Sequence, residues 1–353
     1  MSRGRAHVLV ARQDSAGDVL LAGPAVRAVA AGARRVTLLC GQRGREAATL
    51  LPGVDRVMVA QAPWIDAHAG PVSRTATVAL VTELAARRVD EAVVLTSFHQ
   101  SPLPLALLLR LAGVPRIAAV SVDFPGTLLD VRHRLDENVH EVERGLSLAA
   151  TLGYRLPPGD DGRLAVRRPR AARPLPLPWP AGAGYVVVHP GASAPARAWA
   201  PARSAALVEA LTGRGRRVVV TGGAAERALT ALVAGPARPG VADLGGRLDL
   251  AGLAVVLAGA DAVVVGNTGP AHLAAAVGTP VVSLFAPVVP AARWRPWKVP
   301  HVLLGDQDAA CSGTRARTCP VPGHPCLDGV PVEQVVAAVE RLATRAGGEA
   351  VPA

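Results

Sequence analysis

Short Val-rich runs alternate with longer Ala- and Leu-rich stretches along most of the sequence, and this alternation limits the possible folds more than any other feature. Val-rich runs are typical of buried strands, and the longer stretches are typical of helices. Strands that alternate with helices form parallel sheets that those helices cover. Half of the residues are hydrophobic but only 3% are aromatic. We therefore expect an α/β protein with Val and Leu strands beneath Ala-rich helices.

The alternation occurs once in each half of the chain, and 353 residues suit two domains of ordinary size. In the first half we expect strands over 7–11, 35–40, 56–60, 92–97 and 116–120 and helices over 18–31, 73–88, 102–112 and 136–152. In the second half we expect strands over 185–189, 217–221, 241–244, 262–265, 281–285 and 301–304 and helices over 201–212, 224–234, 250–258, 270–277 and 332–344.

Residues 155–182 are rich in Pro and Arg and show neither the helical nor the strand periodicity of apolar residues, so we interpret them as linker sequence. The expected organisation is two doubly wound domains with parallel sheets, over 1–165 and 184–330, joined by a linker over 166–183. A terminal helix and tail would occupy 331–353. Ligands of such folds bind at the carboxyl edges of the strands, in a cleft.

A formal net charge of +11 raises the question of an acidic partner. Arginine is spread along the whole chain, and no aromatic residues interleave with the clusters at 167–170 and 214–217 to stack on bases. We therefore expect no nucleic acid; a sugar nucleotide or an anionic lipid surface fits the charge equally well. No apolar run reaches ~18 residues, and Met1–Arg5 leads into the first strand without a signal-peptide segment. We expect a cytoplasmic monomer, with contact at the inner face of the membrane left open.

Several common site motifs do not occur in the sequence. No G-x-G-x-x-G, Walker sequence or G-x-S-x-G elbow follows a strand. We disfavour a metal-dependent transferase and expect no cofactor. Cys311, Cys319 and Cys326 lie near His324 but lack a C-x-x-C pair. We interpret this group as structural and expect no metal.

The loop after the first strand carries the candidate catalytic residue. Gly17 permits a tight turn and leaves room for a ligand, and Asp18 follows it. Asp18 is interpreted either as an N-cap of the next helix or as a general base that takes a proton from an attacking hydroxyl. Asp14 is less favoured because we expect it to be more exposed in the loop.

Three strand-to-loop junctions in the second half carry the candidate donor-binding residues. In the first, Gly191 and Ser193 allow close backbone approach, and Arg197 can pair with phosphate oxygens or be an ordinary surface arginine. In the second, Gly222 suits a nucleotide, and Glu226 can bond ribose hydroxyls or favour the first turn of its helix.

The third junction is the turn Asn267–Pro270, which has the strongest local pattern. A buried strand ends, the Asn, Thr268 and Gly269 form a turn, and Pro270 sits at a helix start, where its missing N–H costs nothing. The N–H groups of a helix start bind anions, so a diphosphate is the expected ligand. His272, in the first turn, lies near the same ligand or is simply packed.

In this order and spacing, the sequence resembles glycosyltransferase family 9, the ADP-heptose-dependent heptosyltransferases. The resemblance rests on Gly17-Asp18-Val19-Leu20 with Pro24 and Arg27, His189-Pro190-Gly191-Ala192 with Arg197 and Trp199, Asn267 to Leu273, Leu284-Phe285-Ala286-Pro287 with Arg293-Trp294, and the tail from Cys319 to Leu327. It implies a GT-B fold, two Rossmann-like domains facing a cleft, with the terminal helix crossing back to the first domain. It implies inverting, metal-independent transfer of a heptose from an ADP-sugar to an acceptor hydroxyl.

The resemblance also implies roles for particular residues. Asp18 would be the general base, Arg197 would steady the departing diphosphate, and Thr268-Gly269 would hold its phosphates. Family members that act on lipopolysaccharide commonly carry Lys at the position of Arg197 and Asp at that of Asn267, so the resemblance leaves open whether the transferred sugar is a heptose or a related sugar.

The acceptor is left open by the sequence. Gly17, His99, Gln100, Arg132 and Arg134 are candidate acceptor-binding residues, because their loops are polar and basic. They suit a phosphorylated glycolipid, another glycan or a small glycoside. The alternatives to a heptosyltransferase are another GT-B enzyme that uses a UDP- or GDP-sugar, as a transferase or an epimerase, and a non-catalytic sugar-nucleotide-binding regulator.

Overall fold

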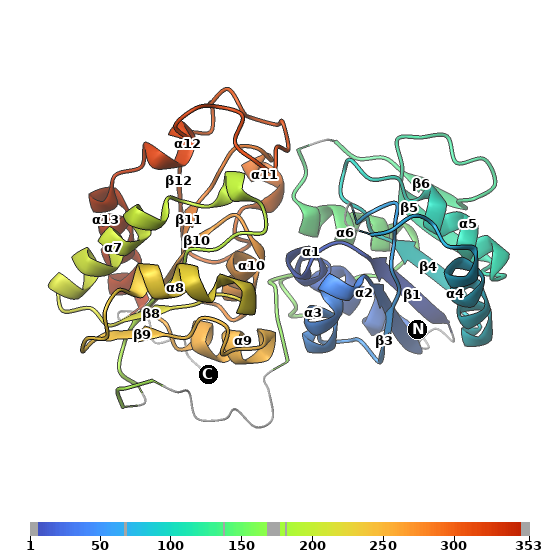
Figure 1. Cartoon of the computed structure of the whole chain (residues 1–353). Helices are drawn as coiled ribbons and strands as arrows, with labels where there is room; N and C mark the ends of the chain where they lie inside the picture. The colour runs from blue at the N-terminus through green and yellow to red at the C-terminus, as the bar shows by residue number, and fades with distance from the viewer. Residues whose placement is uncertain (1–5, 67–68, 137, 168–176, 181, 347–353) are drawn as a thin grey trace. The chain divides into compact units, whose positions relative to one another are not determined.

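The computed structural model describes residues 6–66, 69–136, 138–167, 177–180 and 182–346. The chain forms two compact units, Met1–Arg167 and Arg168–Ala353. Each unit is a parallel six-stranded sheet with helices on both faces (Figure 1). The expected α/β fold with two parallel sheets is therefore confirmed.

The first sheet has the strand order β3-β2-β1-β4-β5-β6, and all of its neighbouring strands are parallel. Its strands are β1 His7–Arg12, β2 Arg35–Cys40, β3 Arg56–Val59, β4 Glu91–Val94, β5 Arg116–Val120 and β6 Val131–His133. The six residues of β1 are all buried, which explains its nearly continuous apolar sequence. The order reverses direction between β1 and β4, and such a switch point is where ligands of open α/β sheets bind.

The second sheet repeats the same topology, with the order β12-β11-β10-β7-β8-β9. Its strands are β7 Val186–His189, β8 Val218–Val220, β9 Val241–Asp243, β10 Ala262–Gly266, β11 Val281–Leu284 and β12 His301–Leu304. Here the switch point lies between β7 and β10, the two central strands, which pair in parallel. Both predicted glycine-rich junctions that follow these strands are thus placed side by side.

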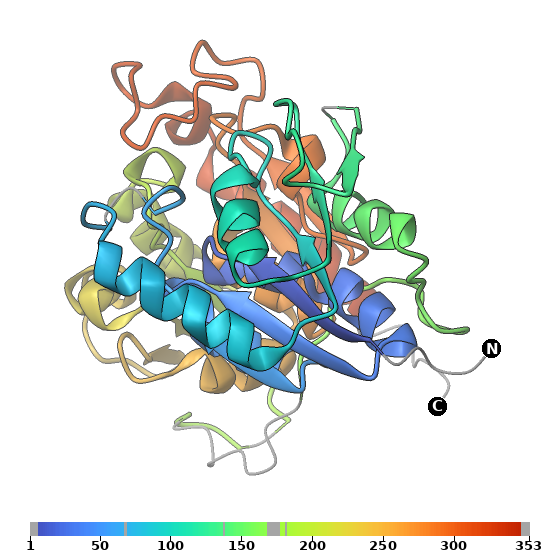
Figure 2. The ribbon, with the colours of Figure 1, turned by 90° about the vertical axis from the view of Figure 1, so that its right-hand side faces the viewer.

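The helices cover each sheet on two sides. Those of the first unit are α1 Ala16–Leu21, α2 Gly23–Gly32, α3 Arg45–Leu50, α4 Arg74–Arg87, α5 Leu103–Leu111 and α6 Glu141–Thr151. Those of the second are α7 Pro201–Gly213, α8 Arg227–Ala234, α9 Leu250–Ala258, α10 Gly269–Ala276, α11 Ala291–Trp294, α12 Pro325–Asp328 and α13 Val332–Ala346. In the first unit α4 packs beside α5, in front of the sheet in Figure 2, and α2 packs beside α6.

Two expectations about local structure were wrong. The single helix expected over 18–31 is two helices, because the chain bends at Ala22 and a new helix begins with Pro24 in its first turn. Within the stretch interpreted as linker, residues before 168 pack on the first unit: Asp160 forms a two-bond ion pair with Arg27, and Arg167 donates to the Val54 carbonyl at 2.6 Å. Of the rest of the expected linker, residues 168–176 and 181 lie outside the described residues.

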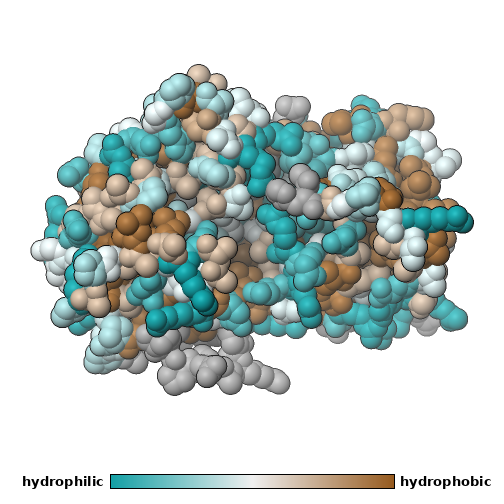
Figure 3. Space-filling model, in the orientation of Figure 1, coloured by the Kyte–Doolittle hydropathy of each residue, from teal (hydrophilic) through white to brown (hydrophobic). Residues whose placement is uncertain are grey.

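The last helix, α13, packs against α7 and along β10, β11 and β12. Its expected return to the first domain stays a prediction. Among the residues that the structure describes, none of the helices has the length and apolar character needed to cross a bilayer. Hydrophilic and hydrophobic residues are interspersed on the face of the molecule shown in Figure 3.

Candidate functional site

A buried arginine lies at the switch point of the first sheet. Arg12 ends β1, and its guanidinium is 4% exposed. One terminal nitrogen donates to Glu141 Oε2 at 2.9 Å, and the other donates to Ser97 Oγ at 2.8 Å and to Asp18 Oδ1 at 3.1 Å. The loop after β1, the loop after β4 and the start of α6 therefore meet at one side chain.

Three carboxylates share this one positive charge. Asp14 Oδ2 lies 3.4 Å from the same Arg12 nitrogen that bonds Asp18. Burial alone would lower the pKa of Arg12, but the carboxylates of Asp14, Glu141 and Asp18 raise it above its usual value. The four residues Arg12, Asp14, Asp18 and Glu141 are called the carboxylate cluster below; with every group ionised, it carries two net negative charges.

Asp18, the candidate base, is held in one orientation by its own helix. The N-cap of α1 is Ser15, whose hydroxyl donates to Asp18 Oδ2 at 2.7 Å and whose backbone N–H donates to the same oxygen at 3.3 Å. Asp18 is thus the third helical residue of a capping box. Its interpretation as the N-cap itself was wrong, because the helix begins two residues earlier than expected; its role as a base stays a prediction.

Asp14 is the more buried of the two loop carboxylates, contrary to our expectation. Its side chain is 7% exposed, against 18% for Asp18. Burial raises the pKa of Asp14 to about 6, with Arg12 opposing the shift and Asp18 adding to it. The Ser97 hydroxyl donates to Asp14 Oδ2 at 2.7 Å. Asp14 therefore titrates near neutral pH within the carboxylate cluster.

The predicted acceptor residues divide into two groups. Gly17 is buried in α1, and Gln100 Oε1 accepts the Ser97 N–H at 3.0 Å, so both lie beside the carboxylate cluster. Arg132 instead lies in β6 and donates to the carbonyls of residues 121 and 122, in the segment after β5. His99 stacks edge-to-face with the Phe98 ring, and Arg134 is exposed.

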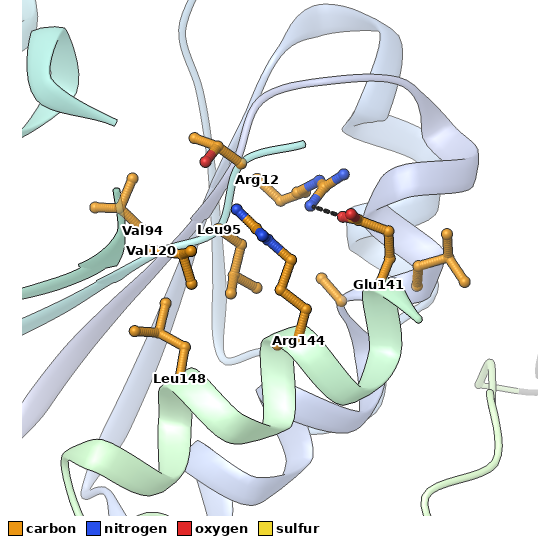
Figure 4. Close-up of a pocket in the computed structure, with 11 residues that line it drawn as sticks. Arg12, Val94, Leu95, Val120, Glu141, Arg144 and Leu148 are labelled. Atoms are coloured by element: carbon orange, nitrogen blue, oxygen red, sulfur yellow. Dashed lines mark hydrogen bonds and ion pairs between the residues drawn. The ribbon is translucent and has the colours of Figure 1, made fainter. Parts of the chain in front are cut away.

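A small pocket adjoins the cluster on the α6 side (Figure 4). It is lined by Arg12, Thr96, Glu141 and Arg144 and by apolar residues that include Leu148. Figure 4 shows Glu141, Arg144 and Leu148 along one helix, α6, with the ion pair between Glu141 and Arg12 at its start. Sequence reasoning missed Arg12, Ser97 and Glu141; the available signal was an arginine at the end of a fully apolar strand.

At the switch point of the second sheet, glycines allow close approach of polar side chains. A Cβ added to Gly191 would lie 2.0 Å from Glu226 Oε1, so only glycine permits the observed position of that carboxylate. Glu226 Oε2 accepts the Gly223 N–H at 2.6 Å at the start of a short 3-10 turn, Ala224–Glu226. Glu226 thus stabilises the first turn of its own helix, which is the alternative to ribose binding considered from the sequence. Gly222 packs against the Glu226 Cβ.

The predicted diphosphate turn follows β10. Thr268 is the N-cap of α10 with Gly269 and Pro270 at the first two helical positions, and His272 is buried in the first turn. The Asn267 side chain donates to the Ala286 carbonyl at 3.2 Å and accepts the Ala286 N–H at 3.3 Å. Asn267 therefore joins the ends of β10 and β11 and sets the position of the turn.

The loop that carries Arg197 is braced by the cysteine-containing tail. Arg197 lies in the 3-10 turn Pro195–Arg197, and a Cβ on Gly266 would meet the Arg197 carbonyl at 2.5 Å, so this turn packs directly on the end of β10. His324 Nε2 lies 3.1 Å from the Ala196 carbonyl. The Arg317 side chain donates to the carbonyl of the exposed Ser193 at 3.2 Å.

The three tail cysteines pack into the core of the second unit. Cys311 and Cys326 are buried and hydrogen-bonded to each other, and Cys319 packs at the edge. Burial and the two neighbouring thiols raise the pKa of Cys326 to about 12. Among the described residues, no group of three His, Cys, Asp or Glu side chains is arranged to hold a metal ion.

The comparison with known families decides the classification. The model of Glycosyltransferase family 9 (heptosyltransferase) matches residues 78–324, well over half of the chain. The chain belongs to this family. The resemblance inferred from the motifs is thereby confirmed. The matched range includes all of the predicted donor-binding residues, whereas Asp18 lies before it.

Individual relatives agree with the family assignment. The chain is 31% identical over 164 residues to lipopolysaccharide heptosyltransferase 3 of Escherichia coli, which is 46% of this chain and 47% of that protein. It is 40% identical over 156 residues to lipopolysaccharide heptosyltransferase 1 of Pseudomonas aeruginosa, covering 43% and 41% of the two chains. The matches span about half the length of these curated relatives.

A solved structure shows the fold over the whole chain. The E. coli ADP-heptose LPS heptosyltransferase II superposes with a TM-score of 0.74 at 18% identity, covering 97% of this chain and 100% of that one. This likeness confirms the expected GT-B fold of this family-9 chain.

Proposed function

We propose that this chain is an inverting glycosyltransferase that moves a heptose, or a related sugar, from an ADP-sugar to an acceptor hydroxyl without a metal. The observation that carries the proposal is the orientation of Asp18 in a family-9 chain. Arg12 and Ser15 fix both carboxylate oxygens at the switch point of the first sheet, where ligands of this fold class bind. The similarity to heptosyltransferases supports a heptose as the transferred sugar.

In this mechanism Asp18 accepts the proton of the acceptor hydroxyl as its oxygen attacks the anomeric carbon. The first unit would bind the acceptor near Gly17 and Gln100, both beside the carboxylate cluster. A carboxylate is suited to this step because it is ionised at neutral pH and its orientation is fixed before the substrate arrives. Inversion follows from a single displacement at that carbon.

The second unit would bind the nucleotide donor. The N-terminus of α10 at Gly269 and Pro270 offers backbone N–H groups and a positive dipole end to a diphosphate. The Arg197 guanidinium would neutralise the charge that develops on the leaving ADP, which is electrostatic stabilisation by protein groups alone. The ADP moiety is supported by the name of the E. coli relative, an ADP-heptose enzyme.

A thermal-shift screen with ADP, UDP, GDP and their sugars tests the donor. A ligand that binds the native state raises the midpoint in proportion to RT ln(1 + [L]/Kd), so saturation at 100 Kd adds about 2.7 kcal/mol. We expect stabilisation by ADP and ADP-heptose. A shift with UDP or GDP alone would show a different nucleotide, and binding of ADP-heptose without transfer to any glycan acceptor would show a regulator.

Asp18→Asn tests the base. We expect kcat to fall about 10²- to 10⁴-fold while the donor Kd stays unchanged, because proton abstraction is lost and donor binding is not. Asp161→Asn is the matched control, since Asp161 is an exposed first-unit carboxylate that pairs with Arg163 at the surface. Full activity of wild type in EDTA would support metal independence, and its loss with recovery on adding Mg²⁺ would overturn it.

A further inference from the structure

We propose that Arg12 is a positioning residue for Asp18: it is anchored by Glu141 and fixes both the orientation and the charge state of the candidate base. This inference rests on the proposed function, because it concerns how that same carboxylate is made ready for the reaction. It gives roles to Arg12, Ser97 and Glu141, which neither the motifs nor the family match single out.

Arg12 has the geometry that such a role requires. Its two terminal nitrogens bond different partners. One donates to Glu141 at 2.9 Å, and the other donates to Asp18 at 3.1 Å and to Ser97 at 2.8 Å. A planar guanidinium that is held on one side presents the other side in a fixed direction. The position of Asp18 Oδ1 is thereby tied to the start of α6, 129 residues from Arg12 along the chain.

The anchor is more deeply buried than the residue that it serves. The side chains of Arg12 and Glu141 are 4% and 1% exposed, whereas Asp18 is 18% exposed. The anchoring pair is therefore shielded from solvent, whereas the Asp18 side chain remains partly accessible to solvent. This gradient suits a support that stays in place while the supported carboxylate meets a substrate.

The adjoining pocket strengthens the anchor. Three of the residues that line it each have a buried polar atom with no hydrogen-bond partner among the described residues: Arg12 Nε, Thr96 Oγ1 and Glu141 Oε1. Buried water typically makes about three hydrogen bonds to such groups. A water there would accept from Arg12, donate to Glu141 and bond the Thr96 hydroxyl, adding a second link between the two ends of the ion pair.

Charge is the second part of the role. The groups that face Asp18 and Arg12 are Asp14 from the same loop and Glu141 from α6, with Arg144 of α6 lining the pocket behind them. Without Arg12, three carboxylates would face each other across a few ångströms. A positive charge beside a carboxylate favours its ionised form, and a like charge disfavours it. Arg12 thus favours the ionised form of Asp18, which is the form that can accept a proton.

Arg12→Gln is the first test, read in the pH profile of kcat/KM. We expect the acid limb to move to higher pH by about one unit or more, because the carboxylate pKa values rise when the cation is removed. At its own optimum the variant should lose about 10- to 100-fold in kcat, with little change in donor KM. Arg12→Lys, which keeps the charge but not the fork, should restore the acid limb and only part of kcat.

Arg27→Gln is the matched control, because Arg27 forms a two-bond pair with Asp160 in the same unit, with side chains that are 14% and 15% exposed. It should lower the unfolding midpoint without moving the acid limb. If Arg12→Gln also leaves the acid limb in place, Arg12 is only structural and the proposal fails. If Arg12→Gln does not fold, Glu141→Gln replaces it: an unchanged kcat there would equally overturn the anchor.

The inference and the proposed function can fail separately. Carboxyl ¹³C chemical shifts followed from pH 4 to 8 report the titration of Asp14 and Asp18 with no substrate present, in wild type and in Arg12→Lys and Arg12→Gln. Higher carboxyl pKa values in Arg12→Gln alone support the role of Arg12 even if no transfer from ADP-heptose is found. Unchanged pKa values contradict it, even if the chain proves to be an active transferase.

Discussion

Replacement of Asp14 by asparagine should change how stability depends on pH. The pKa of Asp14 is about 6 in the folded chain, against an ordinary value of 3.8. Between these values the native state binds more protons than the unfolded state, so this group's contribution to stability is present below pH 4 and is lost as the pH rises through 6. A shift of roughly 2 units corresponds to about 3 kcal/mol.

The amide introduced by Asp14→Asn does not titrate but keeps an acceptor oxygen for the Ser97 hydroxyl. The free energy of unfolding of Asp14→Asn, minus that of wild type, should therefore increase by about 3 kcal/mol between pH 4 and pH 7. Because the chain has two units, urea unfolding should be followed by hydrogen exchange in β1 and β4, which reports the first unit alone.

The exposed carboxylate of Asp161 provides the control for Asp14→Asn. Asp161→Asn, at a side chain that is 55% exposed, should give a difference that stays flat above pH 5. A flat difference for Asp14→Asn would mean that its pKa is ordinary in the folded chain. A difference that falls with pH would mean that attraction to Arg12 outweighs burial, and that the pKa of Asp14 is lowered rather than raised in the folded chain.

Three further substitutions test the second unit. Gly191→Ala places a Cβ 2.0 Å from Glu226 Oε1, so the flexible Glu226 side chain must turn away and lose its bond to the Gly223 N–H. We expect a cost of about 0.5–1.5 kcal/mol in urea unfolding. In a Glu226→Ala background Gly191→Ala should cost little more, and an undiminished cost there would mean that the clash lies elsewhere. Asn267→Asp loses the donor to the Ala286 carbonyl and should destabilise by about 1–3 kcal/mol, whereas an equally stable variant would show that the turn does not depend on that bond. His324→Ala frees the turn that carries the candidate phosphate arginine, so donor KM should rise several-fold with kcat little changed; an unaltered KM would contradict the bracing role.

The sequence predicted the sheets well because each buried strand carries its own signal. Runs such as that of β7 are apolar at every position but the last, since both faces of a parallel sheet are covered. The strand β6, Val131–His133, was missed because it is only three residues long and half-buried, which leaves no periodicity to detect. The bend at Ala22 was missed because both helices around it are apolar, and the packing of each decides the break.

The site could be predicted only where it is local in sequence. Asp18 and the Asn267 turn follow strands directly, so their positions at the sheet edge follow from the topology alone. The pairing of Arg12 with Glu141 spans 129 residues and depends on how α6 packs beside α2. The relative burial of Asp14 and Asp18 likewise depends on the loop after β4, and no spacing within one loop contains that information.

The two switch points differ in charge, and this difference supports the proposed division of roles between them. The first carries one guanidinium and three carboxylates, a net negative group that disfavours a diphosphate and favours proton abstraction. The second presents a helix N-terminus, the Arg197 turn and buried neutral side chains, including His189, whose pKa is lowered by burial despite the nearby Glu226. Two sheets of identical strand order thus differ in charge, and that difference supports the proposed placement of the donor on the second unit and of the base on the first.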